Sequence, residues 1–249
     1  MYMLSFQPDI GAVTRLAARE RLLPPGDDLG YAWHAVFAAS FGEKAPTQFV
    51  YLPPGEHGGG PSGRLLAYSS HSLGHMRDVS ATFADPQFSA PLRLEAALEK
   101  VMPTVFQPGT RLGLQVRLRP VSRSTERRGD DRSGPRGERD VFLRAVDRAG
   151  GTVSVTRAEC YDAWLRDKLI AAGAEVERMR MTAFRFTRLR TRDRSDAHAA
   201  SRSVDGPDAW FRGDCCVTDG ARFSDVLTRG VGRHRAFGFG MILLSPPGA

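Results

Sequence analysis

Cysteine is scarce in this sequence, and its spacing excludes the sites that cysteine usually builds. The 249 residues include only three cysteines, Cys160, Cys215 and Cys216. They form neither a spaced zinc-binding pair nor the even set of a disulfide framework. We therefore expect no disulfide and no cysteine-bound metal, and the composition favours a reducing cytoplasm.

Long apolar runs are also missing. No stretch approaches the roughly 20 apolar residues that a membrane-spanning helix needs. The residues after Met1 lack the basic region and long apolar core of a secretory signal. We therefore expect neither export nor a membrane partner.

Lysine is nearly absent, although the chain is basic. The net charge is +7 and the pI is about 9.8, yet Lys44, Lys100 and Lys168 are the only lysines. Almost all positive charge is therefore arginine, whose guanidinium binds phosphate with paired hydrogen bonds and stacks on bases. This bias favours a nucleic acid as the partner. The absence of helix-turn-helix and zinc-finger patterns disfavours a general DNA-binding module.

Histidine offers only a weak metal-ligand pattern. His71 and His75 are four residues apart, which would suit a helix, but Gly74 and the serines before His71 disfavour a helix there. No third ligand is near in the sequence. We expect no metal ion and no small-molecule cofactor.

The N-terminal half alternates strand and helix patterns. We expect strands at residues 1–7, 48–52, 64–69 and 111–119, and helices at 29–40 and 92–102. Asp27 and Asp28 are suitable N-caps for the first helix. Residues 8–24 are expected to form a loop, and residues 71–91 carry no clear pattern. This order of elements is typical of a ferredoxin-like domain.

The C-terminal half repeats that order after a polar segment. Residues 122–138 are rich in arginine, glycine, aspartate and serine, which indicates a mobile linker. The expected elements are a strand at 139–145, a helix at 157–172, one or two strands at 176–191, a strand at 209–217, a helix at 219–229 and a final strand after Gly240. The predicted fold class is therefore α+β, with two tandem ferredoxin-like (RNA-recognition-like) domains at residues 1–121 and 139–249.

A glycine-rich loop joins the last helix to the last strand. Its glycines and basic residues are Arg229, Gly230, Gly232, Arg233, His234, Arg235, Gly238 and Gly240. Glycine permits positive φ and close approach of the backbone to a ligand, and successive N–H groups bind anions. The loop follows a helix instead of opening one, and it lacks the lysine of a P-loop, so both familiar nucleotide-binding loops are excluded. The alternative is a flexible connection with surface arginines.

The spacing of the glycines resembles the C-terminal loop of the CasE family of CRISPR repeat-processing endoribonucleases, which are subunits of the type I-E Cascade complex. The family pattern is Gly-x-Gly-x-x-Lys-x-x-Gly-x-Gly-Leu-Leu, and Arg235 stands here at the lysine position. Residues 115–120 and 160–165 are similar to two further family elements. The resemblance implies two ferredoxin-like domains and metal-independent cleavage of repeat RNA at the base of a hairpin. It also implies that the protein keeps the crRNA hairpin within Cascade, next to the backbone subunit at the crRNA 3′ end.

Tyr31 and His34 are the first candidate catalytic residues. They are spaced i, i+3 on the predicted first helix and so share one face, with the small Ala35 and Ala38 nearby. Histidine transfers protons near neutral pH. The family carries a Tyr-x-x-His pair on this helix, so the resemblance implies a catalytic role. The alternative is a histidine that is hydrogen-bonded at the edge of the core.

Arginines between residues 178 and 194 form a second candidate site. Phe184, Phe186 and Leu189 alternate with them, as on a hairpin with one buried face. The resemblance implies that this basic hairpin contacts the RNA stem and that a family lysine supports catalysis. Arg188 or Arg190 is the nearest substitute here, and arginine stabilises phosphorane charge but donates protons poorly. The alternative is a solvated charged strand.

Further basic residues complete the expected RNA surface. Arg185 and Arg192 belong to the same hairpin, and Arg117 and Arg119 are placed on the polar side of their strand. His234 is a second candidate acid or base, and the alternative is a contact with a backbone phosphate or an exposed position. A non-cleaving RNA-binding subunit of the same fold is the alternative function, and an active Tyr31/His34 pair distinguishes the two.

Overall fold

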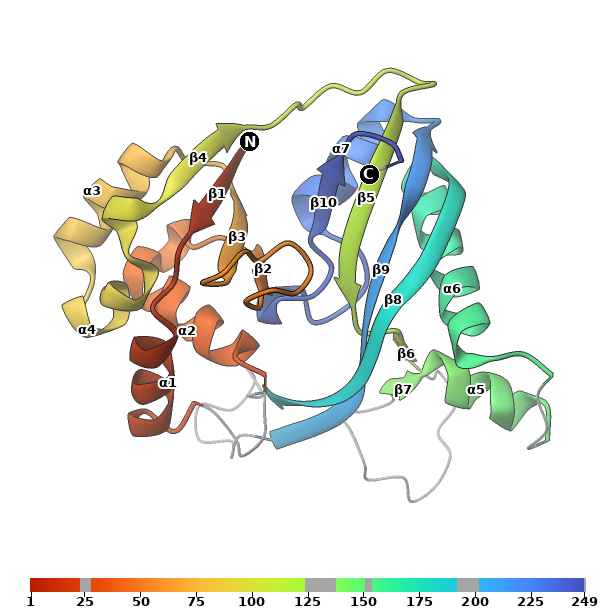
Figure 1. Ribbon diagram of the computed structural model, residues 1–249, viewed down its shortest axis with the longest axis horizontal. Helices are drawn as coiled ribbons and strands as arrows, with labels where there is room; N and C mark the ends of the chain where they lie inside the picture. Colours follow the sequence, from red (N-terminus) through yellow and green to blue (C-terminus); the bar gives the residue numbers. More distant parts are fainter. Residues whose placement is uncertain (23–27, 124–137, 151–153, 192–201, 249) are drawn as a thin grey trace. The chain divides into compact units, whose positions relative to one another are not determined.

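The computed structural model describes residues 1–22, 28–123, 138–150, 154–191 and 202–248. It divides into two compact units (Figure 1). The N-terminal unit contains residues Met1–Thr104 and His234–Met241, and the C-terminal unit contains Val105–Arg233 and Ile242–Ala249. The glycine-rich loop therefore contributes its second half to the N-terminal unit.

The N-terminal unit is a four-stranded antiparallel sheet with helices packed against it. Its elements are β1 (Tyr2–Phe6), α1 (Ile10–Arg19), α2 (Gly30–Phe41), β2 (Gln48–Leu52), β3 (Arg64–Ser69), α3 (Leu73–Phe83), α4 (Pro86–Ser89) and β4 (Leu98–Val101). Short 3₁₀ turns occupy Gly42–Lys44, Ala90–Leu92 and Leu94–Ala96. The strand order is β2-β3-β1-β4, which is the order of a ferredoxin-like sheet.

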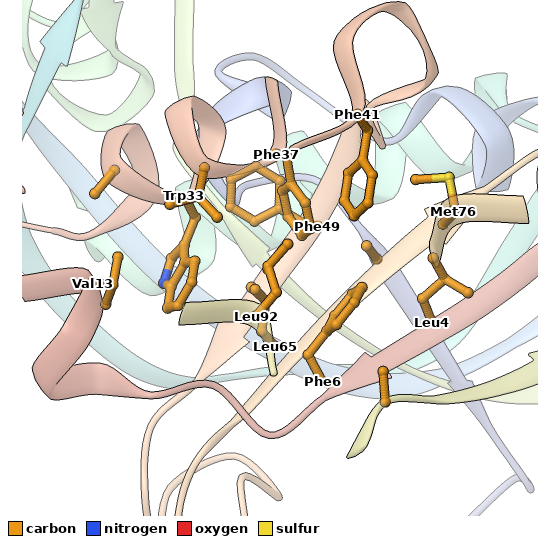
Figure 2. Close-up of a cluster of buried hydrophobic side chains, with 14 of the residues drawn as sticks. Leu4, Phe6, Val13, Trp33, Phe37, Phe41, Phe49, Leu65, Met76 and Leu92 are labelled. Atoms are coloured by element: carbon orange, nitrogen blue, oxygen red, sulfur yellow. The ribbon is translucent and has the colours of Figure 1, made fainter. Parts of the chain in front are cut away.

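The core of this unit lies between the sheet and the helices (Figure 2). Leu4 and Phe6 of β1 face α2, because alternate residues of a strand point to the same side. Trp33 and Phe37 come from α2, and both are almost fully buried. The burial of these large aromatic side chains fixes which face of α2 remains accessible.

Three local assignments in this half were wrong. The expected loop at residues 8–24 contains α1, whose first turn is capped by Asp9 and which buries Val13 and Leu16. No helix was expected near His75, but α3 begins after the N-cap Ser72 and includes this histidine. The expected helix at 92–102 is instead two 3₁₀ turns and β4, because β4 pairs with β1 and this tertiary pairing overrides its helical spacing.

The C-terminal unit has the same sheet arrangement. Its elements are β5 (Arg111–Leu118), β6 (Val121–Arg123), β7 (Glu138–Asp140), α5 (Val141–Arg148), α6 (Arg157–Ala171), β8 (Ala174–Thr191), β9 (Arg202–Val217), α7 (Gly220–Arg229) and β10 (Ile242–Ser245). The order β10-β5-β9-β8 is antiparallel throughout. Both units are thus ferredoxin-like, as the sequence predicted.

The division between the units differs from the expected boundary near residue 121. We placed β5 at the end of the first domain, but it pairs with β9 and β10 and is the first strand of the second sheet. The expected strand at 139–145 is also shorter. β7 ends at Asp140, whose carboxylate accepts a hydrogen bond from the Phe142 N–H at 2.8 Å and starts α5.

β8 and β9 form one long hairpin, in which the two strands pair from Ala174 and Val217 to Thr191 and Arg202. β9 starts before the expected residue 209. α6 lies along β8 and begins with a capping box between Thr156 and Glu159 (Figure 1). Most of the expected linker lies outside the described residues.

Two further findings concern the described residues as a whole. None of their helices is long and apolar enough to cross a membrane. Nor do these residues bring three or more histidine, cysteine, aspartate or glutamate side chains together as metal ligands.

Candidate functional site

Helix α2 presents Tyr31 and His34 at the surface of the N-terminal unit. The Asp28 carboxylate accepts a hydrogen bond from the Gly30 N–H at 2.8 Å, which positions the start of the helix. The opposite side of α2 is anchored in the core through Trp33 and Phe37. Tyr31 and His34 are therefore half-buried and held on a rigid element.

The end of the glycine-rich loop packs against this face of α2. The ring of Phe237 lies 5.8 Å from that of Tyr31 and 5.4 Å, edge to face, from that of His34. His234 lies 6.4 Å from Phe237 on the same loop, and Tyr31 and His34 are also 6.4 Å apart. We call Tyr31, His34, His234 and Phe237 the Phe237 cluster, and it brings a phenol and two imidazoles around one apolar ring.

Gly30 makes this close packing possible. A Cβ at this position would overlap the carbonyl oxygen of Phe237 and lie 2.9 Å from its carbonyl carbon. Only a residue without a Cβ lets the first turn of α2 approach the loop backbone so closely. Gly30 was not a predicted site residue, although a glycine directly after a helix cap was a usable signal.

The four glycines of the loop adopt the backbone conformation that their sequence predicted. Gly230, Gly232, Gly238 and Gly240 have φ values of 75°, 78°, 84° and 83°. His234 has φ of 60°, a left-handed conformation that is uncommon for a residue with a Cβ. Positive φ at these positions turns the chain so that His234 and Phe237 both belong to the cluster.

Two arginines of the loop are paired with carboxylates. Arg233 forms an ion pair with Glu138 of β7, whose side chain is only 6% exposed. Arg229 pairs with Asp225 one turn earlier on α7 at 2.9 Å. Each ion pair orients its guanidinium, a group with several N–H donors in a fixed plane. Arg235 is exposed in the 3₁₀ turn Arg235–Phe237.

The arginines of the hairpin form a separate basic surface on the C-terminal unit. Arg185 pairs with Asp208 at 3.0 Å and Arg188 pairs with Asp205 at 2.9 Å, and their side chains remain 58% and 47% exposed. The hydrogen bond from Arg188 lowers the pKa of Asp205 below its usual value. Arg190 lies opposite Ser203 in the hairpin, and Arg192 lies outside the described residues.

Arg117 and Arg119 were predicted to face outward, but both are buried. Their exposed fractions are 4% and 1%. Arg117 donates to both carboxylate oxygens of Asp208, at 2.9 Å and 2.6 Å, while Arg119 donates to the Val204 carbonyl at 2.7 Å. Partners on β8 and β9 therefore bury both guanidiniums, and this contradicts the expectation that they bind RNA.

Asp208 is the shared partner that the sequence analysis missed. Burial would raise the pKa of its carboxyl, but hydrogen bonding and charge from Arg117, supported by Arg185, hold that pKa below its usual value. The carboxylate therefore stays ionised and ties β5, β8 and β9 together. Phe237 was missed as well, although an aromatic residue inside a glycine-rich loop was a visible signal.

The two repeated sheets place the chain in the class of tandem ferredoxin-like proteins. More narrowly, the chain belongs to the CRISPR associated protein family, whose model matches residues 1–246. The resemblance inferred from the glycine-rich loop is thus confirmed at the level of the family.

Solved structures share this fold over their full length. The CRISPR endoribonuclease Cse3 bound to a 19-nucleotide RNA is 17% identical with a TM-score of 0.62, and the match covers 99% of this chain and 100% of that one. Cas6e from Escherichia coli K-12 is 17% identical with a TM-score of 0.55, again covering 99% and 100%. A chain of a CRISPR RNA-guided surveillance complex, pre-nicking, is 15% identical with a TM-score of 0.55 and the same coverage. A search of curated protein sequences gives no significant match.

Proposed function

We propose that this protein is a metal-independent endoribonuclease that cleaves CRISPR repeat RNA at the base of a hairpin. The observation that carries the proposal is the Phe237 cluster, where Tyr31, His34 and His234 contact one ring. Membership of the CRISPR associated protein family and the fold shared with an RNA-bound endoribonuclease support the same reading.

The proposed reaction is an attack of a ribose 2′-OH on its own 3′ phosphate. The new bond joins the 2′ oxygen to phosphorus, the bond from phosphorus to the 5′ oxygen breaks, and the products are a 2′,3′-cyclic phosphate and a 5′ hydroxyl. The 2′-OH loses a proton and the leaving 5′ oxygen gains one. We assign one of these transfers to His34, and His234 is the candidate for the other. Tyr31 positions the 2′-OH, because the hydroxyl of a neutral phenol is a poor base.

The arginines of the β8–β9 hairpin bind RNA phosphates in this proposal. Arg188 and Arg190 bind phosphates of the RNA, and a guanidinium remains charged throughout the reaction. Arg185, Arg233 and Arg235 bind phosphates of the stem. The deep major groove of A-form RNA hides the base edges, so shape and phosphate contacts dominate binding.

We further propose that the protein keeps the crRNA hairpin after cleavage and acts as a Cascade subunit. The stem phosphates are the same before and after the cut, so cleavage removes none of the contacts that hold the stem. The expected neighbour is the backbone subunit at the crRNA 3′ end. The fold shared with a chain of a CRISPR RNA-guided surveillance complex supports this part of the proposal.

Single-turnover cleavage of repeat RNA in excess EDTA tests the proposal. We expect full activity, a 2′,3′-cyclic phosphate on one product, and no cleavage when the sugar at the cut carries a single 2′-deoxy substitution. The deoxy substrate should still bind with unchanged affinity, which separates chemistry from binding. Loss of cleavage on chelation that magnesium restores would contradict the mechanism.

A non-cleaving RNA-binding subunit is the second candidate function. It is favoured by one observation, namely that arginine replaces the lysine of the related family in the basic hairpin and arginine is a poor proton donor. Tight hairpin binding by the wild-type protein without any cleavage would support this alternative.

A further inference from the structure

Arg157 lies among aromatic side chains on the C-terminal unit. Its guanidinium carbon is 4.4 Å from the ring centre of Phe142, 5.1 Å from that of Phe184 and 5.3 Å from that of Phe186. A guanidinium at such distances is attracted to the faces of the rings. We call Phe142, Arg157, Phe184 and Phe186 the Arg157 platform.

Two buried side chains, Asp140 and Tyr161, hold the Arg157 guanidinium in place. Arg157 pairs with the Asp140 carboxylate and donates to the Tyr161 hydroxyl at 2.6 Å. Tyr161 is fully buried, and its hydroxyl donates in turn to Asp140 at 2.8 Å. The charge of Arg157 is therefore balanced by Asp140, and its main effect at the surface is to hold the aromatic rings in place.

The rings of β8 in this platform are accessible. Phe184 is 36% exposed and Phe186 is 56% exposed, and the two rings stand edge to face with centres 5.3 Å apart. Exposing large aromatic side chains next to one another costs free energy in water, because apolar surface is left hydrated. A pair that is also held rigidly is suited to a flat ligand.

Strand β8 continues from Phe184 and Phe186 of the platform to Arg188. The pairing of β8 with β9 runs without a shift from Phe184 opposite Ala209 to Arg188 opposite Asp205. Phe184, Phe186 and Arg188 are two residues apart and therefore lie on one face of the strand. Arg188 follows Phe186 by about 7 Å along that face. An aromatic ring beside a phosphate-binding cation is the arrangement that proteins use for single-stranded nucleic acid.

We propose that the Arg157 platform binds an unpaired nucleotide of the RNA next to the hairpin. The base stacks on Phe186, and Arg188 contacts the adjoining phosphate. This inference rests on the proposed function, since it assumes that the chain binds repeat RNA. Stacking tolerates every base, so the ligand class is single-stranded RNA of any sequence. A nucleotide presents a flat base and a phosphate together, which matches the exposed Phe186 ring and the exposed Arg188 guanidinium.

Two RNAs test the inference with the full-length protein. One is the stem-loop alone, and the other is the same stem-loop with its unpaired flanks and a 2′-deoxy sugar at the cut to prevent cleavage. Phe186→Ala should weaken binding of the flanked RNA by roughly 5- to 150-fold. It should leave affinity for the bare stem-loop unchanged, and Phe186→Trp should retain both affinities. Phe83→Ala is the matched control, because this phenylalanine of α3 is 81% exposed and lies in the other unit.

Salt dependence and fluorescence identify the kind of contact. The fold-loss of affinity for the flanked RNA caused by Phe186→Ala should be equal at all salt concentrations. Arg188→Ala should instead flatten the slope of log affinity against log salt by roughly 0.7, the value for a contact to a single strand. A 2-aminopurine placed at each flank position in turn should be quenched at one position by the wild type and not by Phe186→Ala.

Other results overturn the inference. Unchanged affinity of Phe186→Ala for the flanked RNA, or an equal loss for both RNAs, would exclude stacking of a flank base. Unchanged RNA affinity together with lost association with a protein subunit would assign the platform to protein docking. Failure of the wild type to bind either RNA would overturn the proposed function itself, which separates the two cases.

Discussion

Replacing Gly30 with alanine probes the contact between α2 and the glycine-rich loop. The added Cβ would overlap the Phe237 carbonyl oxygen and lie 2.7 Å from an Asp28 carboxylate oxygen. Backbone atoms cannot rotate away, so the loop must move by on the order of 1 Å to restore ordinary contact distances. We expect the Phe237 ring to move with the loop and to leave its place beside His34.

The magnitude follows from two opposing effects. Overpacking costs about 1–3 kcal/mol, and alanine in a helix gains about 1 kcal/mol over glycine, so the net destabilisation is about 0–2 kcal/mol. A misplacement of about 1 Å can lower a catalysed rate by roughly 100-fold. We therefore expect Gly30→Ala to lose activity much more than stability.

The assay is single-turnover cleavage of repeat RNA beside a thermal unfolding curve. Gly74→Ala is the matched control, because Gly74 lies in the first turn of α3 and a Cβ there meets nothing closer than the Ser72 hydroxyl at 4.0 Å. We expect this control to keep its activity and to melt at the same or a slightly higher temperature. Wild-type cleavage and stability in Gly30→Ala would refute the packing of Phe237 on α2 as a requirement for catalysis.

Three more predictions concern the C-terminal unit. Arg117→Ala leaves the Asp208 carboxylate buried and without its main partner, so denaturant unfolding should show that the free energy of unfolding falls by about 3–5 kcal/mol. Arg111→Ala, at an exposed ion pair, is the control and should unfold like the wild type. The pKa of Asp208 is lowered in the folded state, so its ionised carboxylate stabilises the fold fully above the ordinary aspartate pKa of about 3.9, and this stabilisation is lost as the pH falls below that value. Acid unfolding of Asp208→Asn should therefore lack this pH-dependent loss of stability. An acid-unfolding profile identical to that of the wild type would contradict the prediction. If Arg188 contacts a phosphate of the unpaired flank and Arg233 a phosphate of the stem, single alanine substitutions should flatten the salt slope of binding to the flanked RNA by roughly 0.7–0.9, and unchanged slopes would place the RNA on another surface.

Local patterns predicted the elements that local forces decide. The i, i+3 spacing of Tyr31 and His34 placed both on one face of α2, and the four loop glycines predicted positive φ. The alternation of residues 111–119 predicted a strand correctly. These features depend on backbone geometry and on neighbours in the sequence, so the sequence alone was sufficient.

Features that depend on distant partners were not predictable in the same way. The alternation in β5 could not tell that its neighbours are β9 and β10, so the boundary near residue 121 was misplaced. The same alternation put Arg117 on a polar face, but its partner Asp208 lies 91 residues away. β4 carries helical spacing and is a strand only because it pairs with β1.

The candidate site shows the same limit. Tyr31 and His34 were identified from their own helix, but Phe237 lies about 200 residues later and reaches them only through the fold. The Arg157 platform likewise joins α5, α6 and β8, which are separated in the sequence. In both cases the sequence contained the residues, and only the tertiary structure supplied their grouping.

The most direct test of the proposed function is a paired measurement on His34→Ala. We expect single-turnover cleavage of repeat RNA to fall by roughly 10²–10⁴-fold, because one proton-transfer group is lost. Hairpin affinity should change little, Tyr31→Phe should lose less activity, and His75→Ala, at an exposed histidine of α3, should cleave like the wild type. Cleavage by His34→Ala at the wild-type rate would show that the α2 pair is not the catalytic site and would make His234 the next residue to test.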